Sequence, residues 1–284
     1  PQLGFAVTVC SGVTNMVLDA LLVTLLPQEY KLAGAAVATA MSQVVGGGVP
    51  LIYFFRKNSS LLRLGKTSWD GKAVLKACTN GESEFMSNVS MNFVGMLYNI
   101  QLLKYAGENG VAAYGVMMYV SMIFSAVFIG YSIGSAPVIS YHFGAQNHPE
   151  LKGLLRKSLT MIGTFSVFMA IAAEMSAVPL AKVFVSYDAA LMELTVSGFR
   201  IFALSFLFMG FAIFGSGFFT ALNDGLTSAL ISFLRTLVFE TAAVLLLPLI
   251  WGINGIWVSV VVAECMAVTL TVIFLILKRK KYYY

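Results

Sequence analysis

Eight long apolar runs, separated by shorter polar segments, dominate the hydropathy pattern of the chain. A membrane-spanning helix needs about 20 mostly apolar residues, because it rises about 1.5 Å per residue across a hydrocarbon core about 30 Å thick. The runs that meet this length lie at 4–26, 33–55, 84–105, 111–141, 157–178, 194–221, 227–249 and 255–277. The pattern predicts an all-α integral membrane protein with eight transmembrane helices.

Two of these runs, the fourth and the sixth, are longer than a bilayer requires. Glycine and proline inside a long helix are the usual causes of bends. The candidate bend positions are Gly130, Gly134 and Pro137 in the fourth run and Gly210, Gly215 and Gly217 in the sixth.

The composition agrees with a membrane protein and excludes several other classes. Of the 284 residues, 58% are hydrophobic and 11% are charged, whereas soluble domains carry about 25% charged residues. The net charge of +5 does not indicate nucleic-acid binding, since the basic residues lie between apolar runs and at the C-terminal end. The three cysteines have no metal or redox spacing, and His142 and His148 share a polar loop, so we expect no metal site and no cofactor.

Basic residues gather in three polar segments, which follow the second, fourth and eighth predicted spans. Because an even number of spans separates them, all three lie on the same side of the membrane. They are Arg56, Lys57, Arg63, Lys66, Lys72 and Lys76, then Lys152, Arg156 and Lys157, and finally Lys278, Arg279, Lys280 and Lys281. The opposite loops carry only Lys31 and Lys182, with Lys104 at the end of a span. The positive-inside rule predicts that the three segments, and the C-terminus, are cytoplasmic in a multi-pass protein of the cell membrane.

The polar segments also divide the chain. Residues 57–83 are polar and basic, which predicts a cytoplasmic linker between the two helices of 1–56 and a six-helix bundle at 84–281. Residues 142–156 predict a second cytoplasmic loop, with a short amphipathic helix at the membrane surface.

The first two runs contain polar side chains at membrane depth. Asn15 and Asp19 are four residues apart and share one helix face. The returning run brings Thr39 and Gln43 past the same depth. A carboxylate in the hydrocarbon region costs roughly 2.5–3.5 kcal/mol, so it marks a candidate functional site. The four side chains could bind a monovalent cation, or a proton on Asp19; alternatively, they hydrogen-bond the two helices together.

The last two runs repeat the first two at a fixed offset of 221 residues, without a gap. The matched positions are Gly4 with Gly225, Leu25-Leu26-Pro27 with Leu246-Leu247-Pro248, Gly34 with Gly255, Val37 with Val258, Asp19 with Glu240, and Gln43 with Glu264. Both copies run in the same direction, which predicts two six-helix bundles related by an axis along the membrane normal. If the offset holds, about 140 residues with four further helices precede Pro1 in a twelve-helix transporter.

Four charged residues of the later spans are further candidates. Glu240 and Glu264 lie about halfway along adjacent spans. If they face each other they share a proton or cation, and if they face a water-filled cavity separately they attract cationic substrate. Glu174 and Arg200 lie at equal depth near the outer ends of their spans, which predicts an ion pair that either closes an outer gate or is only structural.

Methionines are frequent on the third and fourth spans. They are Met86, Met91, Met96, Met117, Met118 and Met122. Soft, flexible side chains of this kind suit a promiscuous binding surface, although most methionines in a membrane protein contact lipid or neighbouring helices.

Three motifs resemble the MATE (multidrug and toxic compound extrusion) transporter family. They are NMVLD at 15–19 with LAGAAVATAMSQ at 32–43, GYSIGSAPVISYHFGAQN at 130–147, and GFFTALND at 217–224. The resemblance is collinear over nearly the whole chain and matches the fifth to twelfth helices of that family.

The resemblance implies an antiporter that exports small amphipathic, often cationic compounds in exchange for sodium ions or protons. We expect a monomer whose partners are these compounds and the lipid bilayer. The resemblance also implies that Asn15, Asp19 and Thr39 contribute to a cation site whose further acid lies on the first helix of the family.

A flippase for lipid-linked sugars shares the architecture, but the acids at mid-membrane, with Arg200 and Arg235 only near span ends, favour cationic cargo. An enzyme is excluded, because the spans contain no histidine and neither HExxH nor GxSxG.

Overall fold

The computed structural model describes residues 2–56 and 69–284, apart from the side chains of residues 80, 83, 84 and 87. The chain divides into two compact units, Pro1–Asp70 and Gly71–Tyr284. Residues 57–68, the first part of the predicted linker, lie outside the described residues. In the remainder of that segment, helix α3 begins at Gly71.

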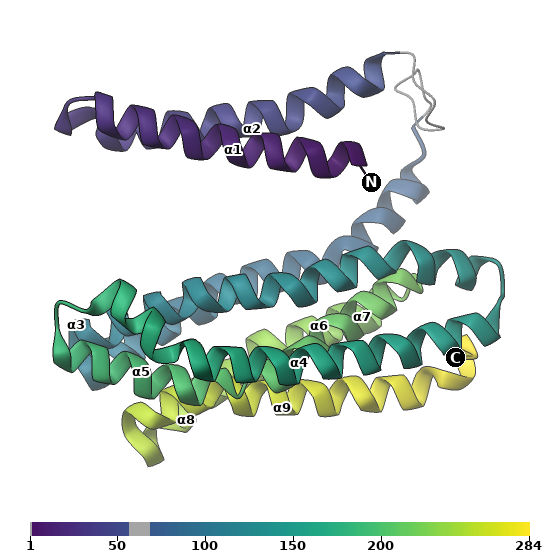
Figure 1. The fold of residues 1–284 in the computed structure, drawn as a ribbon. Coiled ribbons are helices and arrows are strands. Elements are labelled where there is room, and N and C mark those ends of the chain that lie inside the picture. Colours follow the sequence, from purple (N-terminus) through teal and green to yellow (C-terminus); the bar gives the residue numbers. More distant parts are fainter. Residues whose placement is uncertain (1, 57–68) are drawn as a thin grey trace. The chain divides into compact units, whose positions relative to one another are not determined.

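The first unit is a helical hairpin. Helices α1 (Gln2–Leu25) and α2 (Lys31–Phe55) lie antiparallel, joined by a turn that contains the short 3-10 helix η1 (Gln28–Tyr30) (Figure 1). Small side chains allow the helices to approach closely, as is common between membrane helices. The Ser11 hydroxyl, for example, donates a 2.8 Å hydrogen bond to the backbone carbonyl of Ser42.

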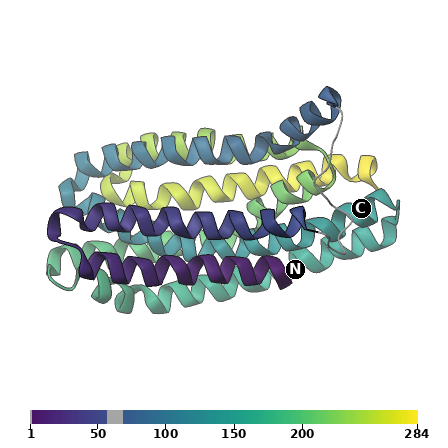
Figure 2. The ribbon, with the colours of Figure 1, turned by 90° about the horizontal axis from the view of Figure 1, so that it is seen from above.

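The second unit is a helical bundle whose helices run side by side in both views (Figures 1 and 2). Its first helix, α3 (Gly71–Gly144), folds back on itself at Gly107, where the backbone takes φ 62° and ψ −153°. The other elements are α4 (His148–Val185), α5 (Ala189–Ala203), α6 (Phe206–Ala221), α7 (Gly225–Phe233), the π-helix η2 (Leu234–Glu240), α8 (Thr241–Leu246) and α9 (Pro248–Tyr282).

The helices account for the predicted spans. Among the described residues, six helices are long and apolar enough to cross a membrane, and the bent pair α5–α6 provides a seventh span. Because α3 turns back at Gly107, its two arms correspond to the third and fourth predicted spans. The all-helical membrane fold is therefore confirmed.

The predicted bend of the sixth span occurs, but not at its glycines. The axes of α5 and α6 differ by 50° at Leu204–Ser205. The glycines of α6 instead allow close packing, because a Cβ atom at Gly210 would lie 2.5 Å from the Phe128 ring. A Cβ atom at Gly215 would overlap Thr271, and one at Gly217 would overlap Ser132. The glycine pattern therefore marks the faces of α6 that contact α3, α4 and α9.

The structure also lacks the predicted loop at 142–156 and its short surface helix. Helix α3 continues to Gly144 and α4 begins at His148, so that only residues 145–147 form the turn. The Asn147 side chain accepts a hydrogen bond from the backbone N–H of Glu150, and Pro149 occupies the first turn. Both features favour the start of a helix at this point.

The internal repeat has a counterpart in the packing of both units. A Cβ atom at Gly34 would lie 2.7 Å from the Leu26 side chain, and one at Gly255 would overlap the Leu247 backbone. These two pairs are equivalent at the offset of 221 residues. The glycines are thus required where each hairpin closes after its proline.

The C-terminal residues fold against the end of the bundle where α3 meets α4. Tyr282 and Tyr284 are buried, at 6% and 5% exposure, within an aromatic cluster that includes Phe143 and Phe218. The Tyr282 hydroxyl and the Lys278 ammonium both contact the Asp224 carboxylate, at 2.7 and 3.3 Å. The α3–α4 turn and the chain end therefore lie on the same side, as their basic residues predict.

Candidate functional site

The first unit brings together three of the four predicted polar side chains. The Asn15 amide donates a long, 3.5 Å hydrogen bond to the Thr39 hydroxyl across the hairpin. Asp19 lies one turn along α1 from Asn15, and its Oδ1 atom is buried without a hydrogen-bond partner. Gln43 is exposed on α2 and makes no hydrogen bond to any residue that the structure describes. The hairpin thus holds a carboxylate oxygen without a described hydrogen-bond partner one helical turn from an amide that contacts a hydroxyl.

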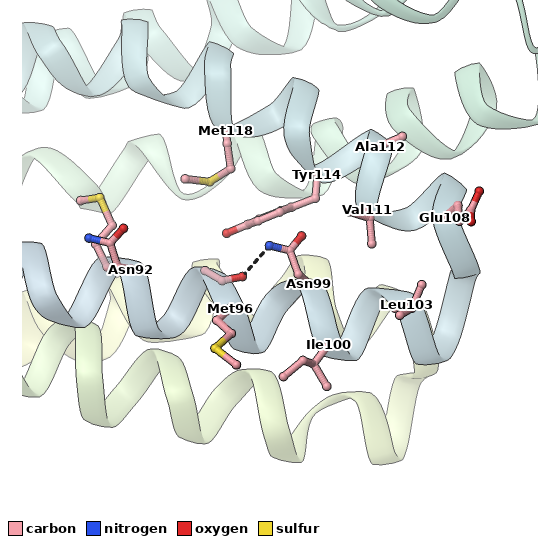
Figure 3. Close-up of a pocket in the computed structure, with 12 residues that line it drawn as sticks. Asn92, Met96, Asn99, Ile100, Leu103, Glu108, Val111, Ala112, Tyr114 and Met118 are labelled. Atoms are coloured by element: carbon pink, nitrogen blue, oxygen red, sulfur yellow. Dashed lines mark hydrogen bonds between the residues drawn. The ribbon is translucent and has the colours of Figure 1, made fainter.

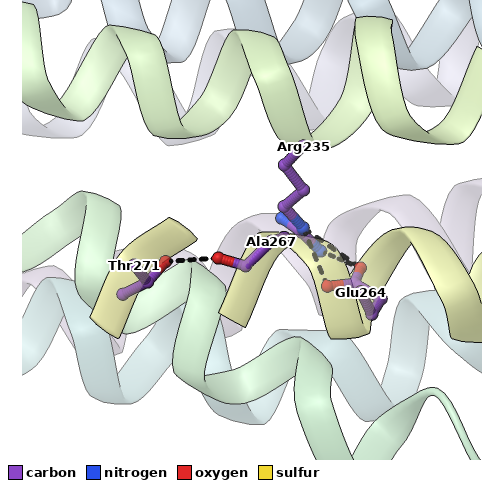
Figure 4. Close-up of polar contacts among 4 residues, drawn as sticks. All are labelled: Arg235, Glu264, Ala267 and Thr271. Carbon is purple, nitrogen blue, oxygen red and sulfur yellow. Dashed lines mark hydrogen bonds and ion pairs between the residues drawn. The ribbon is translucent and has the colours of Figure 1, made fainter. Parts of the chain in front are cut away.

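In the second unit the two predicted acids do not form a carboxylate pair. Arg235 Nε donates to both carboxylate oxygens of Glu264, each at 3.0 Å, and Nη2 donates to Oε1 at 2.5 Å (Figure 4). The Glu264 residue is only 5% exposed. Our expectation that Arg235 lies near the end of its span is wrong, because its side chain reaches an acid inside the bundle.

The π-helix η2 brings the side chains of Arg235 and Glu240 toward the same face of the helix. In an α-helix, residues five apart point about 140° away from each other. The i→i+5 hydrogen bonding of η2 widens the turn and brings such residues closer to one face. Glu240 interacts electrostatically with Arg235 and Glu264, and also with Tyr98 and Tyr114 of α3.

The two tyrosines come from opposite arms of α3. Their rings stack with centroids 5.0 Å apart and planes inclined by 12°. The Tyr98 hydroxyl is buried and has no hydrogen-bond partner among the described residues. Arg235 and Tyr98 are site residues that the sequence analysis missed. The five-residue spacing of Arg235 and Glu240 does not fit an α-helical face, and an apolar-run analysis gives tyrosine no special weight.

Glu174 of α4 and Arg200 of α5 form an ion pair, with Arg200 Nε 3.1 Å from Glu174 Oε1. Both side chains are about half exposed, at 50% and 55%. Arg200 also lines a groove of about 620 Å³ beside Glu193 and Ser197. The contact is therefore an exposed ion pair on the surface of the second unit.

A larger groove, of about 990 Å³, lies between the two arms of α3 (Figure 3). Three of the six methionines noted above, Met91, Met96 and Met118, line it, whereas Met117 is fully buried in the core. Asn92 and Asn99 also line the groove, and each donates an amide N–H to the preceding turn of its own helix. Their side-chain oxygens remain as acceptors, and Glu108 adds a carboxylate to this mainly apolar surface.

The chemistry of these sites is that of ion and small-molecule binding. Within residues 2–56 and 69–284, no group of three or more histidine, cysteine or acidic side chains could hold a metal ion. The available groups are carboxylates, amides, hydroxyls, one buried guanidinium and flexible apolar side chains.

Comparison with known proteins agrees with the arrangement of helices. The family model described as MatE matches residues 85–246, which is more than half of the chain. Multidrug export protein MepA of Staphylococcus saprophyticus is 24% identical over 273 residues, which cover 95% of this chain and 59% of MepA. The probable multidrug resistance protein NorM of Thermotoga maritima is 23% identical over 251 residues, covering 87% of this chain and 53% of NorM.

Solved structures show the same fold. A MOP superfamily transporter from Pyrococcus furiosus, described as having a binding pocket of reverse polarity, gives a TM-score of 0.88 at 19% identity. The outward-facing conformation of a multidrug resistance MATE family transporter gives 0.87 at 20% identity. Each comparison covers 97% of this chain and 62% of the other. The chain thus spans about three fifths of the length of these proteins, and it is a multi-pass membrane protein that belongs to the MatE family of transporters.

Proposed function

We propose that the protein is a secondary transporter that exports amphipathic cationic compounds in exchange for sodium ions or protons, by alternating access. The observation that carries this proposal is the Asp19 carboxylate, which lies at membrane depth with a buried oxygen that has no hydrogen-bond partner. An intramembrane acid of this kind is costly unless it binds a cation or a proton. The Asn15–Thr39 contact supplies an amide and a hydroxyl oxygen beside it.

The exported compound binds, in this proposal, at the groove of α3. Methionine side chains adapt to aromatic and aliphatic groups of different shape. The Tyr114 ring offers a face for a cation, and the oxygens of Asn92 and Asn99 accept hydrogen bonds from it. MepA and NorM are named for multidrug export and multidrug resistance, which fits a groove of this chemistry.

The alternative cargo, a lipid-linked sugar pyrophosphate, has less support. A dianionic head group would require an excess of buried basic side chains. The buried guanidinium, that of Arg235, is already paired with Glu264, and Glu240 adds a further acid. The charge of this region is therefore suited to cations rather than anions.

The test is efflux of a fluorescent lipophilic cation from vesicles that contain the protein with its natural upstream sequence. Sodium and pH gradients are applied separately. We expect gradient-driven efflux in the wild type and its loss in Asp19→Asn, because the neutral side chain cannot exchange a cation. The matched control is Glu29→Gln, which neutralises an exposed acid in the turn between α1 and α2 and leaves efflux intact. Wild-type vesicles that move no cation under either gradient would rule out this function.

The direction of the chain in the membrane is part of the same proposal. The basic segments at 152–157 and 278–281 lie at one end of the second unit, and we place that end in the cytoplasm. Labelling of single cysteines, introduced at Lys280 and at Lys182 after removal of the native ones, distinguishes the two orientations. Reaction of the Lys182→Cys variant alone with an impermeant reagent in intact cells is the expected result.

A further inference from the structure

Three charged side chains that interact within the second unit do not balance. Glu240 and Glu264 contribute two negative charges, and Arg235 contributes one positive charge, in one region between η2 and α9. An uncompensated charge inside a membrane bundle is costly, so that the site favours the uptake of one positive charge.

The two acids differ in how they are held. Glu264 receives three hydrogen bonds from Arg235, and its side chain is only 6% exposed. Bidentate contact of this kind stabilises an ionised carboxylate. Glu240 lies on the same wide turn as Arg235, but it makes no such contact with the guanidinium. The surplus negative charge therefore lies at Glu240.

The groups around Glu240 come from every element packed against η2. Helix α9 presents Glu264 and Cys265, and the two arms of α3 present Tyr98 and Tyr114. Helices α7 and α8 carry no titratable side chain. Tyr98 is only 1% exposed, its hydroxyl has no hydrogen-bond partner among the described residues, and it interacts electrostatically with Glu240.

A hydroxyl in this position serves either charge state of Glu240. It donates to an ionised carboxylate and accepts from a protonated one. A metal ion would have to lie beside the fixed positive charge of Arg235, which opposes it, whereas a proton needs no shell of ligands. The site is therefore better suited to a proton than to a metal cation.

We infer that Glu240 takes up and releases one proton, while Arg235 keeps Glu264 ionised throughout. On protonation the proton moves from water to a Glu240 carboxylate oxygen, and the net charge of the three side chains changes from minus one to zero. This inference deepens the proposed function, on which its link to transport rests, by assigning a proton site to the second unit.

The test measures protonation directly and needs no transport. The 284-residue chain is purified in detergent, and the infrared C=O stretching band of protonated carboxylic acids is followed from about pH 5 to about pH 8. We expect a titrating band in the wild type that disappears in Glu240→Gln and persists in Glu174→Gln, a control at an exposed acid. Glu240→Asp, which keeps the acid, should restore the band with a shifted pH midpoint.

A second variant tests the role of Arg235. In Arg235→Gln the Glu264 carboxylate loses its partner, so an additional band should appear that is absent from Arg235→Gln/Glu264→Gln. The inference is overturned if the wild-type band persists in Glu240→Gln, if Glu264→Gln removes it in a folded protein, or if no titrating band is present. Because these spectra do not depend on export, an intact band with no efflux would refute the proposed function instead.

Discussion

The Tyr282 hydroxyl donates a 2.7 Å hydrogen bond to the Asp224 carboxylate, and so joins the end of α9 to the start of α7. Asp224 also accepts a hydrogen bond from the backbone N–H of Thr227 and caps α7. Lys278 and Lys281 approach the same carboxylate oxygen, at 3.3 and 3.8 Å. One acid thus connects α7 to the end of α9 through a residue 58 positions further along the chain.

Removal of the Tyr282 hydroxyl should destabilise the second unit. Tyr282→Phe keeps the buried ring but removes a hydrogen bond to a charged acceptor, which is worth about 1.5–3 kcal/mol. We expect a lower unfolding temperature in detergent, measured by circular dichroism. Tyr283→Phe is the matched control, because that adjacent side chain is 66% exposed. Equal unfolding temperatures for the two variants would show that the hydrogen bond contributes little.

The same contact predicts how stability depends on pH. Burial raises the pKa of Asp224, but hydrogen bonds from Tyr282 and Thr227 and the charge of Lys278 lower it more, leaving it below its ordinary value. A lowered folded-state pKa gives stability that is present above the unfolded value, about 3.9, and is lost as the pH falls through the folded value. We expect the wild-type unfolding temperature to fall more steeply below about pH 4 than that of Asp224→Asn. Parallel pH profiles of the two proteins would contradict this prediction.

The glycines of α6 predict a difference between two alanine substitutions. Gly210→Ala places a methyl group against the Phe128 ring and Ile162, and such overpacking costs about 1–3 kcal/mol. Gly130 lies at an exposed helical position, with no atom within 4 Å of the added carbon. Gly130→Ala should therefore raise the free energy of unfolding by about 0.5–1 kcal/mol. Unfolding temperatures that move in opposite directions are the expected result, and a neutral Gly210→Ala would show that the Phe128 ring moves aside.

The Glu174–Arg200 ion pair should matter more for transport than for stability. Exposed pairs contribute about 0.2–1 kcal/mol, so Arg200→Gln should change the unfolding temperature little. If the pair closes a gate, Arg200→Gln alters the efflux rate and the exchanged pair Glu174→Arg/Arg200→Glu restores it. An efflux rate that is unchanged by Arg200→Gln would assign the pair a structural role only.

The membrane fold could be predicted because hydrocarbon thickness imposes a minimum length on each apolar run. The turn at Gly107 falls between the predicted ends of two spans, at 105 and 111. The start of α4 was missed, although Asn147, Pro149 and Glu150 form a helix-start pattern. The position of the bend, at Leu204–Ser205, could not be predicted, because neither residue restricts the backbone as proline does.

The site was only partly predictable for a related reason. Asp19, Glu240 and Glu264 stand out because an acid inside an apolar run is rare. Their partners depend on helix geometry, and no apolar pattern marks the wide turn at 234–240 that carries Arg235. Sequence reasoning therefore identified the acids correctly as unusual, but it could not determine which of them is neutralised.

The glycines of α6 also limit how the second unit moves. A side chain can change rotamer when its neighbour shifts, but glycine at 210, 215 and 217 has no such freedom, and Phe128, Ser132 and Thr271 rest directly on the α6 backbone. Sliding of α6 along these neighbours would require several simultaneous displacements in a close-packed interior. Any conformational cycle should therefore carry α6 and its contacts as one rigid body, with backbone rotation concentrated at Leu204–Ser205.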